Sequence, residues 1–289
     1  MTHAPLLYDT PEAWRAAPGK RVTFFGMSGL GKTRLSNLLR KTGAWFHYSV
    51  DYRIGTAYLG EAIADNLKRE AMKVPLLAEL LRSDSIYIGS NIGFANLAPL
   101  SSYLGKPGDP ALGGLPISEY RARQAQHRAA EVAALLDAPA FIVRARDLYG
   151  YSHFINDTGG SICEVVDPED PADPVLSALS ASTLMVWLEG DEAHTQTLIE
   201  RFARKPKPMY YRPEFLDRLW TAHGHDDVDP DVFGRTAYAE VIAARQPRYA
   251  AMARNWGVTV RAEDTADLRD AADVEDLVAR AIGNRSGQA

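Results

Sequence analysis

An α/β fold built around a parallel sheet is predicted by three features of the sequence. Short apolar segments recur along the chain, segments with helical periodicity separate them, and acidic residues stand at the ends of three apolar segments. Strands that alternate with helices are typical of a parallel sheet covered by helices on both faces. Because such sheets bind ligands beyond the carboxyl ends of their strands, we expect Asp51, Asp157 and Glu189 to gather there.

Five apolar segments are expected to form the strands. In chain order they cover residues 22–25, 45–50, 153–156, 183–188 and 258–260. Helical patterns are expected at about 56–82, 117–136 and 213–256, and a closing helix carries an apolar face from Val274 to Ile282.

The segment after the first expected strand fits the phosphate-binding (Walker A) pattern G-x-x-x-x-G-K-[ST]. A strand leads into it, and Leu35, Leu38 and Leu39 follow at helical spacing, which is the context that this loop requires. Its glycines let backbone N–H groups turn toward an anion, and the helix N-terminus adds a favourable dipole. The sequence therefore predicts a nucleoside triphosphate site on the residues Gly26-Met27-Ser28-Gly29-Leu30-Gly31-Lys32-Thr33.

Three side chains of this loop and its helix have expected roles. Lys32 is expected to reach the β- and γ-phosphates, and the Thr33 hydroxyl to ligate Mg²⁺. Arg34, the next residue, is counted with the nucleotide-binding residues. The chain has no Asn-Lys-x-Asp segment that would read guanine, so the predicted cofactors are ATP and Mg²⁺.

Composition narrows the class of protein. The chain has 289 residues, 46% of them hydrophobic and 24% charged, which is typical of an ordinary globular protein. A net charge of −5 argues against a general nucleic-acid binder. The single cysteine, Cys163, rules out an internal disulfide and is expected to be a buried apolar residue rather than a nucleophile. Without a signal-peptide pattern or an apolar run of the ~20 residues that span a bilayer, the expected location is the cytoplasm.

The spacing of the strands is uneven. Far more residues separate the second and third strands than one crossover helix requires. We therefore expect a single domain over 1–289, with a helical insertion at about 56–150 that forms much of the second-substrate pocket. A lid and helical region is expected at about 195–256.

Asp51 and Arg53 follow the second expected strand. A carboxylate there can accept a proton from a substrate hydroxyl, and a guanidinium offers a forked donor to an anionic substrate group. The alternative is a helix cap followed by an exposed arginine.

Asp157, Gly159 and Gly160 follow the third expected strand. Asp157 stands where phosphate-loop proteins commonly place a metal-linked carboxylate, and the glycines would let a substrate approach the backbone closely. The alternative is a plain turn into a helix with local caps.

A basic cluster over residues 201–208 follows the fourth expected strand and the helix after it. Arg201 and Arg204 share one face at helical spacing, and arginine suits the charge that develops on a transferring phosphoryl group. The cluster is interpreted as a lid that closes over phosphates, although charge runs are often only solvated faces.

Two further groups of polar residues are weaker candidates. A helical face of the insertion could bind an anionic acceptor or could simply be solvated, and it carries Tyr120, Arg121, Arg123, His127 and Arg128. The histidine- and aspartate-rich segment 223–227 is better interpreted as a hydrophilic loop than as a metal cluster.

Taken in order, these motifs resemble the shikimate-kinase and nucleoside-monophosphate-kinase group of P-loop kinases, and also bacterial proteins usually called simply "ATPase". The resemblance implies the three-layer α/β/α sandwich of P-loop NTPases, with sheet order 2-3-1-4-5. It places Asp51 near the acceptor hydroxyl and makes Arg53, Gly159 and Gly160 acceptor-binding residues. It also places Asp264 and Thr265, after the fifth strand, beside the adenine.

The sequence departs from shikimate kinases in two ways. The insertion after Asp51 is much longer, and the usual Gly-Gly-Gly is reduced to Thr-Gly-Gly-Ser at 158–161, so an acceptor other than shikimate is expected.

The function expected first is a Mg²⁺-dependent ATP phosphotransferase, a kinase that acts on a small molecule. A regulatory or mechanical ATPase that signals to a protein partner is the main alternative, and a nucleotide-binding module without turnover is a third. The expected partner is a small-molecule phosphoryl acceptor; neither nucleic acid nor a membrane is expected, and a homodimer is left open.

Overall fold

The computed structural model describes residues 5–286, which fall into two compact units. The first unit takes in the chain up to Val50, then Leu135–Lys205, and the chain from Ala237 onward. The second unit consists of Asp51–Ala134 and Pro206–Thr236. The single domain expected over 1–289 stays a prediction, and its two ends, 1–4 and 287–289, lie outside the described residues.

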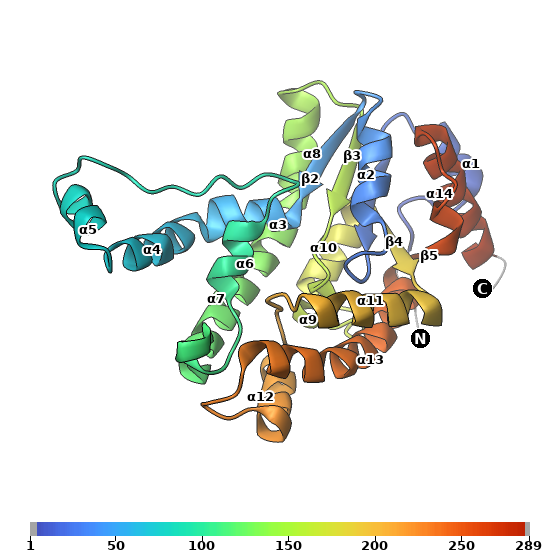
Figure 1. Cartoon of the computed structure of the whole chain (residues 1–289). Coiled ribbons are helices and arrows are strands. Elements are labelled where there is room, and N and C mark those ends of the chain that lie inside the picture. The colour runs from blue at the N-terminus through green and yellow to red at the C-terminus, as the bar shows by residue number, and fades with distance from the viewer. Residues whose placement is uncertain (1–4, 287–289) are drawn as a thin grey trace. The chain divides into compact units, whose positions relative to one another are not determined.

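The first unit is built on a five-stranded sheet in the order β2-β3-β1-β4-β5, with every neighbouring pair parallel (Figure 1). The α/β class, the five strands and their order are therefore confirmed. The strands are β1 (Arg21–Phe25), β2 (Trp45–Ser49), β3 (His153–Asp157), β4 (Leu184–Glu189) and β5 (Gly257–Arg261).

Several strand ends differ from the expectation by one residue, and two of them are explained by local contacts. Val50 was expected to end the second strand, but it opens the helix α3 (Val50–Arg53), because pairing of β2 with β3 ends at Ser49 and Asp157. Thr183 precedes β4, since its N–H and hydroxyl both donate to the Leu179 carbonyl at the end of the preceding helix.

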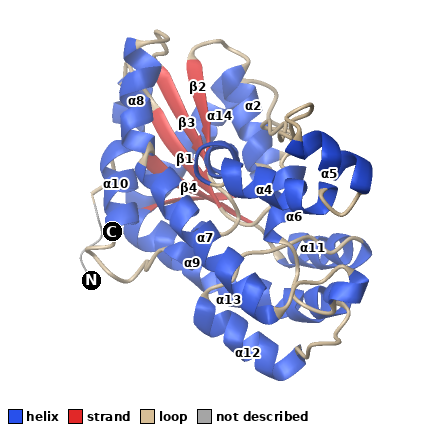
Figure 2. Cartoon of the chain, turned by 90° about the vertical axis from the view of Figure 1, so that its left-hand side faces the viewer, coloured by secondary structure: helices blue, strands red, loops and turns tan. Residues whose placement is uncertain are grey.

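Helices cover both faces of the sheet (Figures 1 and 2). The helices α1, α2 and α14 lie on one face, and α8 and α10 lie on the other. Of these, α2 follows the phosphate loop directly. The bounds are α1 (Pro11–Ala16), α2 (Lys32–Arg40), α8 (Ala138–Asp147), α9 (Ile162–Val165), α10 (Pro174–Ser182), α11 (Glu192–Arg204) and α14 (Ala271–Ser286).

Helix α8 lies within the range that was expected to be insertion. Phe141 of α8 packs against the rings of Phe46 and Tyr48 on β2, with centroid distances of 6.5 and 4.9 Å. These contacts make α8 part of the first unit, so the helical segment of the second unit ends at Ala134 rather than near residue 150.

After Arg21, the central strand β1 is apolar except for one threonine. Val22, Phe24 and Phe25 are fully buried, which makes β1 the middle of the core. Thr23 is also buried, and its hydroxyl oxygen lies 2.7 Å from that of Thr183 and 3.2 Å from the Asn156 side-chain nitrogen. The Asn156 amide nitrogen thus gives the buried Thr23 hydroxyl a hydrogen-bond partner across the sheet interior.

The second unit is mostly helical. Its helices are α4 (Gly60–Ala71), α5 (Pro75–Arg82), α6 (Ala98–Leu104) and α12 (Pro213–His223), and the unit boundary falls within α3, α7 (Ile117–Leu136) and α13 (Pro230–Trp256). Short turns of helix occur at Ile54–Tyr58 and Pro110–Leu112, and in the first unit at Glu263–Thr265. The two segments of the unit are joined by backbone pairing, in which the Asp109 N–H donates to the Val228 carbonyl at 2.9 Å.

No membrane-spanning helix is found in the part of the chain that the structure describes. None of the helices within residues 5–286 has both the length and the apolar character that crossing a bilayer requires.

Candidate nucleotide and phosphoryl-transfer site

The phosphate loop connects β1 to α2, as expected, and its glycines are required by its backbone. Gly26, Gly29 and Gly31 have φ values of 134°, 93° and 103°, a region that other residues rarely adopt. A Cβ at Gly26 would lie 2.7 Å from the carbonyl oxygen of Leu188 on β4, and one at Gly29 would lie 2.9 Å from the Leu198 side chain on α11. The loop therefore fits closely between β4 and α11.

The ammonium group of Lys32 lies inside this loop. Its Nζ donates to the carbonyl oxygens of Gly26 and Met27 at 2.8 and 3.0 Å, and the residue is buried. Lys32 is also the first residue of α2, so the positive charge sits beside the positive end of the helix dipole. A buried cation held by loop carbonyls at a helix N-terminus is suited to binding an anion.

The side chains of Thr33 and Asp157 meet beside the loop. The Thr33 hydroxyl donates to Oδ2 of Asp157 at 3.2 Å, and the same oxygen lies 3.5 Å from Nε2 of His47 on β2. The register of the sheet brings them together, because Asp157 is paired with Phe24 of β1 and with Ser49 of β2.

The Thr33 and Asp157 oxygens fit a magnesium ion. Mg²⁺ prefers oxygen ligands and is commonly held by one or two carboxylates together with substrate phosphates rather than by a protein cage. Residues 5–286 contain no group of three or more His, Cys, Asp or Glu side chains arranged to hold a metal. A hydroxyl and a carboxylate next to a phosphate loop are the oxygens that such an ion needs.

The turn after β5 borders the other side of the loop. A Cβ at Gly31 would lie 3.7 Å from the Thr265 hydroxyl. Arg34 binds this turn, because its guanidinium donates to the carbonyl of Thr265, to that of Ala266 at 3.0 Å and to that of Leu268 at 2.7 Å. Arg34 thus holds the segment that carries Thr265 and the exposed Asp264, and the contact of these residues with adenine stays a prediction.

Gly160 lies directly against the phosphate loop. A Cβ at this position would lie 2.5 Å from the Ser28 hydroxyl and 3.1 Å from the Ser28 backbone nitrogen, so a larger residue would require Ser28 to shift. The Gly160 carbonyl accepts from Arg245 Nη1 at 2.9 Å and from the Tyr249 hydroxyl at 2.6 Å. Thr158 fixes the start of the turn, since its hydroxyl donates to the Phe24 carbonyl at 3.0 Å.

Arg245 and Tyr249 were missed in the sequence. They lie within the helical segment expected at 213–256, where their spacing of four residues puts them on one face. Nothing in their local sequence shows that this face meets Gly160, because the contact depends on the packing of α13.

The expected lid arginines lie on α11. Arg201 and Arg204 are exposed in its last turn, whereas Leu198 and Phe202 are buried. Because Leu198 lies near Gly29, α11 passes beside the phosphate loop and carries Arg201 one turn beyond that contact. The closing movement expected of this segment stays a prediction.

Asp51 and Arg53 belong to the second unit. Asp51 is its first residue and lies in α3, one peptide bond from Val50. The Arg53 guanidinium lies 5.5 Å from the centroid of the Tyr58 ring, a cation–π arrangement. The roles expected for Asp51 and Arg53 toward an acceptor stay predictions.

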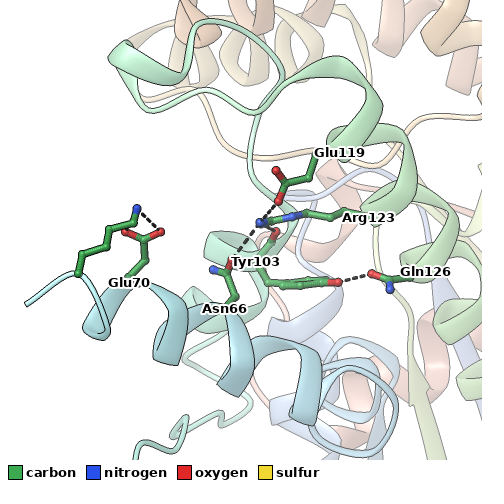
Figure 3. Close-up of polar contacts among 7 residues, drawn as sticks. Asn66, Glu70, Tyr103, Glu119, Arg123 and Gln126 are labelled. Carbon is green, nitrogen blue, oxygen red and sulfur yellow. Dashed lines mark hydrogen bonds and ion pairs between the residues drawn. The ribbon is translucent and has the colours of Figure 1, made fainter. Parts of the chain in front are cut away.

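Arg123 is buried in a polar network of the second unit (Figure 3). Its guanidinium donates to the Tyr103 carbonyl, to Asn66 Oδ1 at 2.9 Å and to Glu119 Oε1 at 2.6 Å, and it lies over the Tyr103 ring. The Tyr103 hydroxyl in turn donates to Gln126, and burial raises the pKa of this phenol. Since Arg123 is buried and three of its five N–H donors are used in these contacts, it has a structural role in this unit rather than the anion-binding role considered above.

Two other polar features considered above, Arg121 and the segment 223–227, form exposed ion pairs. Arg121 forms an exposed ion pair with Asp217. In the segment 223–227, His225 contacts Asp227 at 2.6 Å on an exposed loop, in agreement with the hydrophilic loop expected there.

Cys163 is buried, as expected, and its thiol is unreactive. Burial raises the pKa of the Cys163 thiol to about 12, so the thiolate needed for nucleophilic attack is not formed near neutral pH.

Comparison with known proteins gives similarity at the level of structure. No protein-family model matches the sequence, and no curated protein matches it. Among solved structures, the shikimate kinase from Bacteroides thetaiotaomicron is similar with a TM-score of 0.39 at 15% identity, over 90% of this chain and 95% of that chain. The shikimate kinase from Aquifex aeolicus is similar with a TM-score of 0.36 at 14% identity, over 93% of this chain and 99% of that one.

Proposed function

We propose that this protein is a Mg²⁺-dependent ATP phosphotransferase that acts on a small-molecule acceptor. The observation that carries the proposal is the arrangement around the phosphate loop. The Lys32 ammonium is buried within the loop, and the Thr33 hydroxyl and the Asp157 carboxylate lie 3.2 Å apart beside it. A cation, backbone amides and a pair of metal-ligating oxygens are the groups that phosphoryl transfer uses.

The residues have distinct roles in this proposal. Lys32 and the loop amides bind the β- and γ-phosphates, and Thr33 and Asp157 hold Mg²⁺. When bound, the ion neutralises charge on the phosphate oxygens. Arg201 and Arg204 on α11 supply further positive charge. This charge stabilises the negative charge that develops on the transferred phosphoryl group. Catalysis then depends on positioning and electrostatics rather than on a covalent intermediate.

The acceptor side of the proposal rests on Asp51, Arg53 and the glycine turn. Asp51 orients the acceptor hydroxyl or takes up its proton, and Arg53 binds an anionic group of the acceptor. Gly159 and Gly160 let the acceptor approach the backbone. The single cysteine, buried and unpaired, supports the reducing environment of the cytoplasm as the place of action.

Nucleotide binding is tested with Lys32→Ala. Saturating Mg·ATP should stabilise the wild type, by about 2.7 kcal/mol at a hundred times Kd, and should leave Lys32→Ala unchanged. Thermal unfolding with and without Mg·ATP measures this, and Lys41→Ala, an exposed lysine at the end of the same helix, is the control. An equal shift in wild type and Lys32→Ala would remove the loop from the function.

Product analysis separates the kinase from the ATPase. A kinase forms ADP without free phosphate when an acceptor is supplied, so mass spectrometry should detect a phosphorylated acceptor in a metabolite mixture incubated with the protein and Mg·ATP. Phosphate release that no acceptor alters would instead favour an ATPase.

A further inference from the structure

The carbonyl group of Gly160 is held by two buried side chains of one helix. Nη1 of Arg245 and the hydroxyl of Tyr249 both donate to it, at 2.9 and 2.6 Å. Arg245 and Tyr249 are one turn apart in α13, so their side chains leave the same face of the helix. Both lone pairs of this carbonyl are therefore used, and its direction is fixed.

The same face of α13 holds the short helix α9 that follows the glycine turn. Arg245 Nε donates to Glu164 Oε1 at 2.9 Å, and the two side chains are 5% and 1% exposed. Arg248 donates to the carbonyls of Cys163 at 2.6 Å and Val166 at 2.5 Å. Residues 160–166 are thus fixed at several points to α13, which lies beside α9 in Figure 2.

Arg245 and Tyr249 are both in the protonation state that donates hydrogen bonds. Burial opposes the positive charge of Arg245, but its neighbours Cys163, Tyr249 and Glu164 outweigh burial and raise its pKa above the ordinary value. Burial also raises the pKa of the Tyr249 phenol well above its usual range. Arg245 therefore stays charged and Tyr249 keeps its proton throughout the physiological pH range.

The turn that these side chains hold is confined on its other side by the phosphate loop. Gly160 meets Ser28 so closely that an added Cβ would force Ser28 to shift. Asp157, which contacts Thr33, lies three residues before Gly160 in the same segment. A shift of the Gly160 carbonyl would therefore move the backbone of residues 157–160. This segment carries the Asp157 carboxylate as well as the two glycines that the acceptor is expected to approach.

We infer that Arg245 and Tyr249 are positioning residues of the phosphoryl-transfer site, which act by fixing the Gly160 carbonyl and holding the glycine turn against Ser28. This inference rests on the proposed function, since it concerns the turn on which the acceptor is expected to bind. Neither residue touches the reacting atoms. Their effect is exerted through the backbone of residues 158–161.

The test compares Tyr249→Phe and Arg245→Lys with Tyr238→Phe. Tyr249→Phe removes one hydroxyl and keeps the ring that packs near Phe25 and Trp187. Arg245→Lys keeps the charge beside Glu164 but loses the fork that reaches two acceptors. Tyr238 is a matched control because it is a buried tyrosine of the same helix whose ring stacks on Phe202, whereas the hydroxyl that donates to Gly160 belongs to Tyr249.

Two measurements are made on each full-length protein with Mg·ATP as the probe. The first is hydrogen exchange of the amides of residues 159–161. The second is the rate of ADP formation, with water as the phosphoryl acceptor.

Tyr249→Phe and Arg245→Lys should speed exchange at these amides and lower kcat by roughly tenfold, because small misplacements of a reacting group are costly. The KM for ATP should stay within about twofold, since the phosphate loop itself is intact, and Tyr238→Phe should change neither quantity.

The outcomes separate this inference from the proposed function. Unchanged exchange and unchanged kcat in both variants would overturn the positioning role. A rise in KM for ATP at constant kcat would also overturn it, because the residues would then act on nucleotide binding. If the wild type forms ADP neither with water nor with the metabolite mixture that supplies the acceptor, the proposed function fails, and the exchange comparison with Tyr238→Phe still decides whether Tyr249 and Arg245 hold the turn.

Discussion

Asp157 belongs both to the sheet and to the candidate site. It ends β3, and its Oδ2 lies 3.2 Å from the Thr33 hydroxyl and 3.5 Å from Nε2 of His47. It is also largely buried, so the carboxylate is oriented by protein contacts rather than by water. At the residue scale, metal-dependent binding of nucleotide is expected to depend on this side chain.

Asp157→Asn should uncouple nucleotide binding from Mg²⁺. The amide keeps the shape of the side chain but loses the negative charge that Mg²⁺ prefers. We expect the ATP affinity measured in EDTA to stay within about twofold of the wild-type value. The increase in ATP affinity that Mg²⁺ causes should fall by at least about tenfold, the range known for metal-site substitutions. Isothermal titration with ATP, with Mg²⁺ and with EDTA, measures both. Asp267→Asn, at an exposed position of the same unit, is the control, and a full Mg²⁺ response in Asp157→Asn would exclude Asp157 as a ligand.

At the scale of elements, the phosphate loop is shaped by the strand and helix beside it. Gly26 turns away from β1 with φ of 134° next to the Leu188 carbonyl of β4. Gly29 faces Leu198 of α11. The loop is therefore determined by tertiary contacts as well as by its own glycine pattern.

Gly26→Ala should destabilise this loop more than Gly43→Ala destabilises the turn after α2. Both glycines have positive φ, 134° and 75°, so alanine is strained at either position, by roughly 1–2 kcal/mol. Only at Gly26 does the added Cβ meet backbone, 2.7 Å from the Leu188 oxygen, whereas at Gly43 nothing lies within 4 Å. Urea unfolding should show the larger loss for Gly26→Ala, and only this variant should lose the Mg·ATP shift. Equal losses of stability in the two variants would contradict the contact with β4.

Other elements show where sequence patterns were sufficient. The helix at 117–136 has the bounds expected from its periodicity. Helices α8 and α10 were not expected. Helix α10 begins after the proline-rich acidic segment, and Asp173 caps it by accepting from the backbone N–H groups of Val175 and Leu176 at 3.0 and 2.9 Å. The cap was present in the sequence as Asp173-Pro174, an N-cap residue followed by proline at the first helical position.

At the scale of the whole molecule, one half-buried histidine links stability to pH. His153 opens β3, and its Nδ1 accepts from the backbone N–H of Lys20 at 2.9 Å, so this nitrogen must be unprotonated in the fold. Burial, and then the charge of Lys20, lower the pKa of His153 below its ordinary 6.5. Because the unfolded chain takes up the proton first, this contribution to stability is complete above pH 6.5 and is lost as pH falls toward the lowered pKa.

His153→Asn should reduce the loss of stability on acidification. Asparagine can accept the Lys20 N–H but does not titrate, so the free energy of unfolding should depend less on pH below 6.5 than in the wild type. Urea unfolding at a series of pH values from neutral to mildly acidic measures the slope. A slope identical to that of the wild type would show that His153 is not the group responsible.

The division of the chain into two units could be predicted only in part. The long separation of the second and third strands indicated an inserted segment, and the second unit does begin at Asp51, directly after β2 and Val50. That residues 206–236 join this unit could not be seen, because it depends on backbone pairing between segments far apart in the sequence, such as Asp109 with Val228. Arg123 was open to two interpretations for the same reason, since Asn66 and Tyr103 reach it only in the folded chain.

The sequence by itself determined the local features: five strands, a phosphate loop between the first strand and its helix, and the residues Lys32 and Thr33 at the start of that helix. These follow from periodicity and from the backbone freedom of glycine, which act between residues close together in the chain. Only the tertiary structure placed Asp157 beside Thr33 and showed that Arg34 donates hydrogen bonds to the turn after β5. It also brought Arg245 and Tyr249 to the Gly160 carbonyl. Such contacts depend on which buried faces pack together, and packing is a property of the whole core rather than of any one segment.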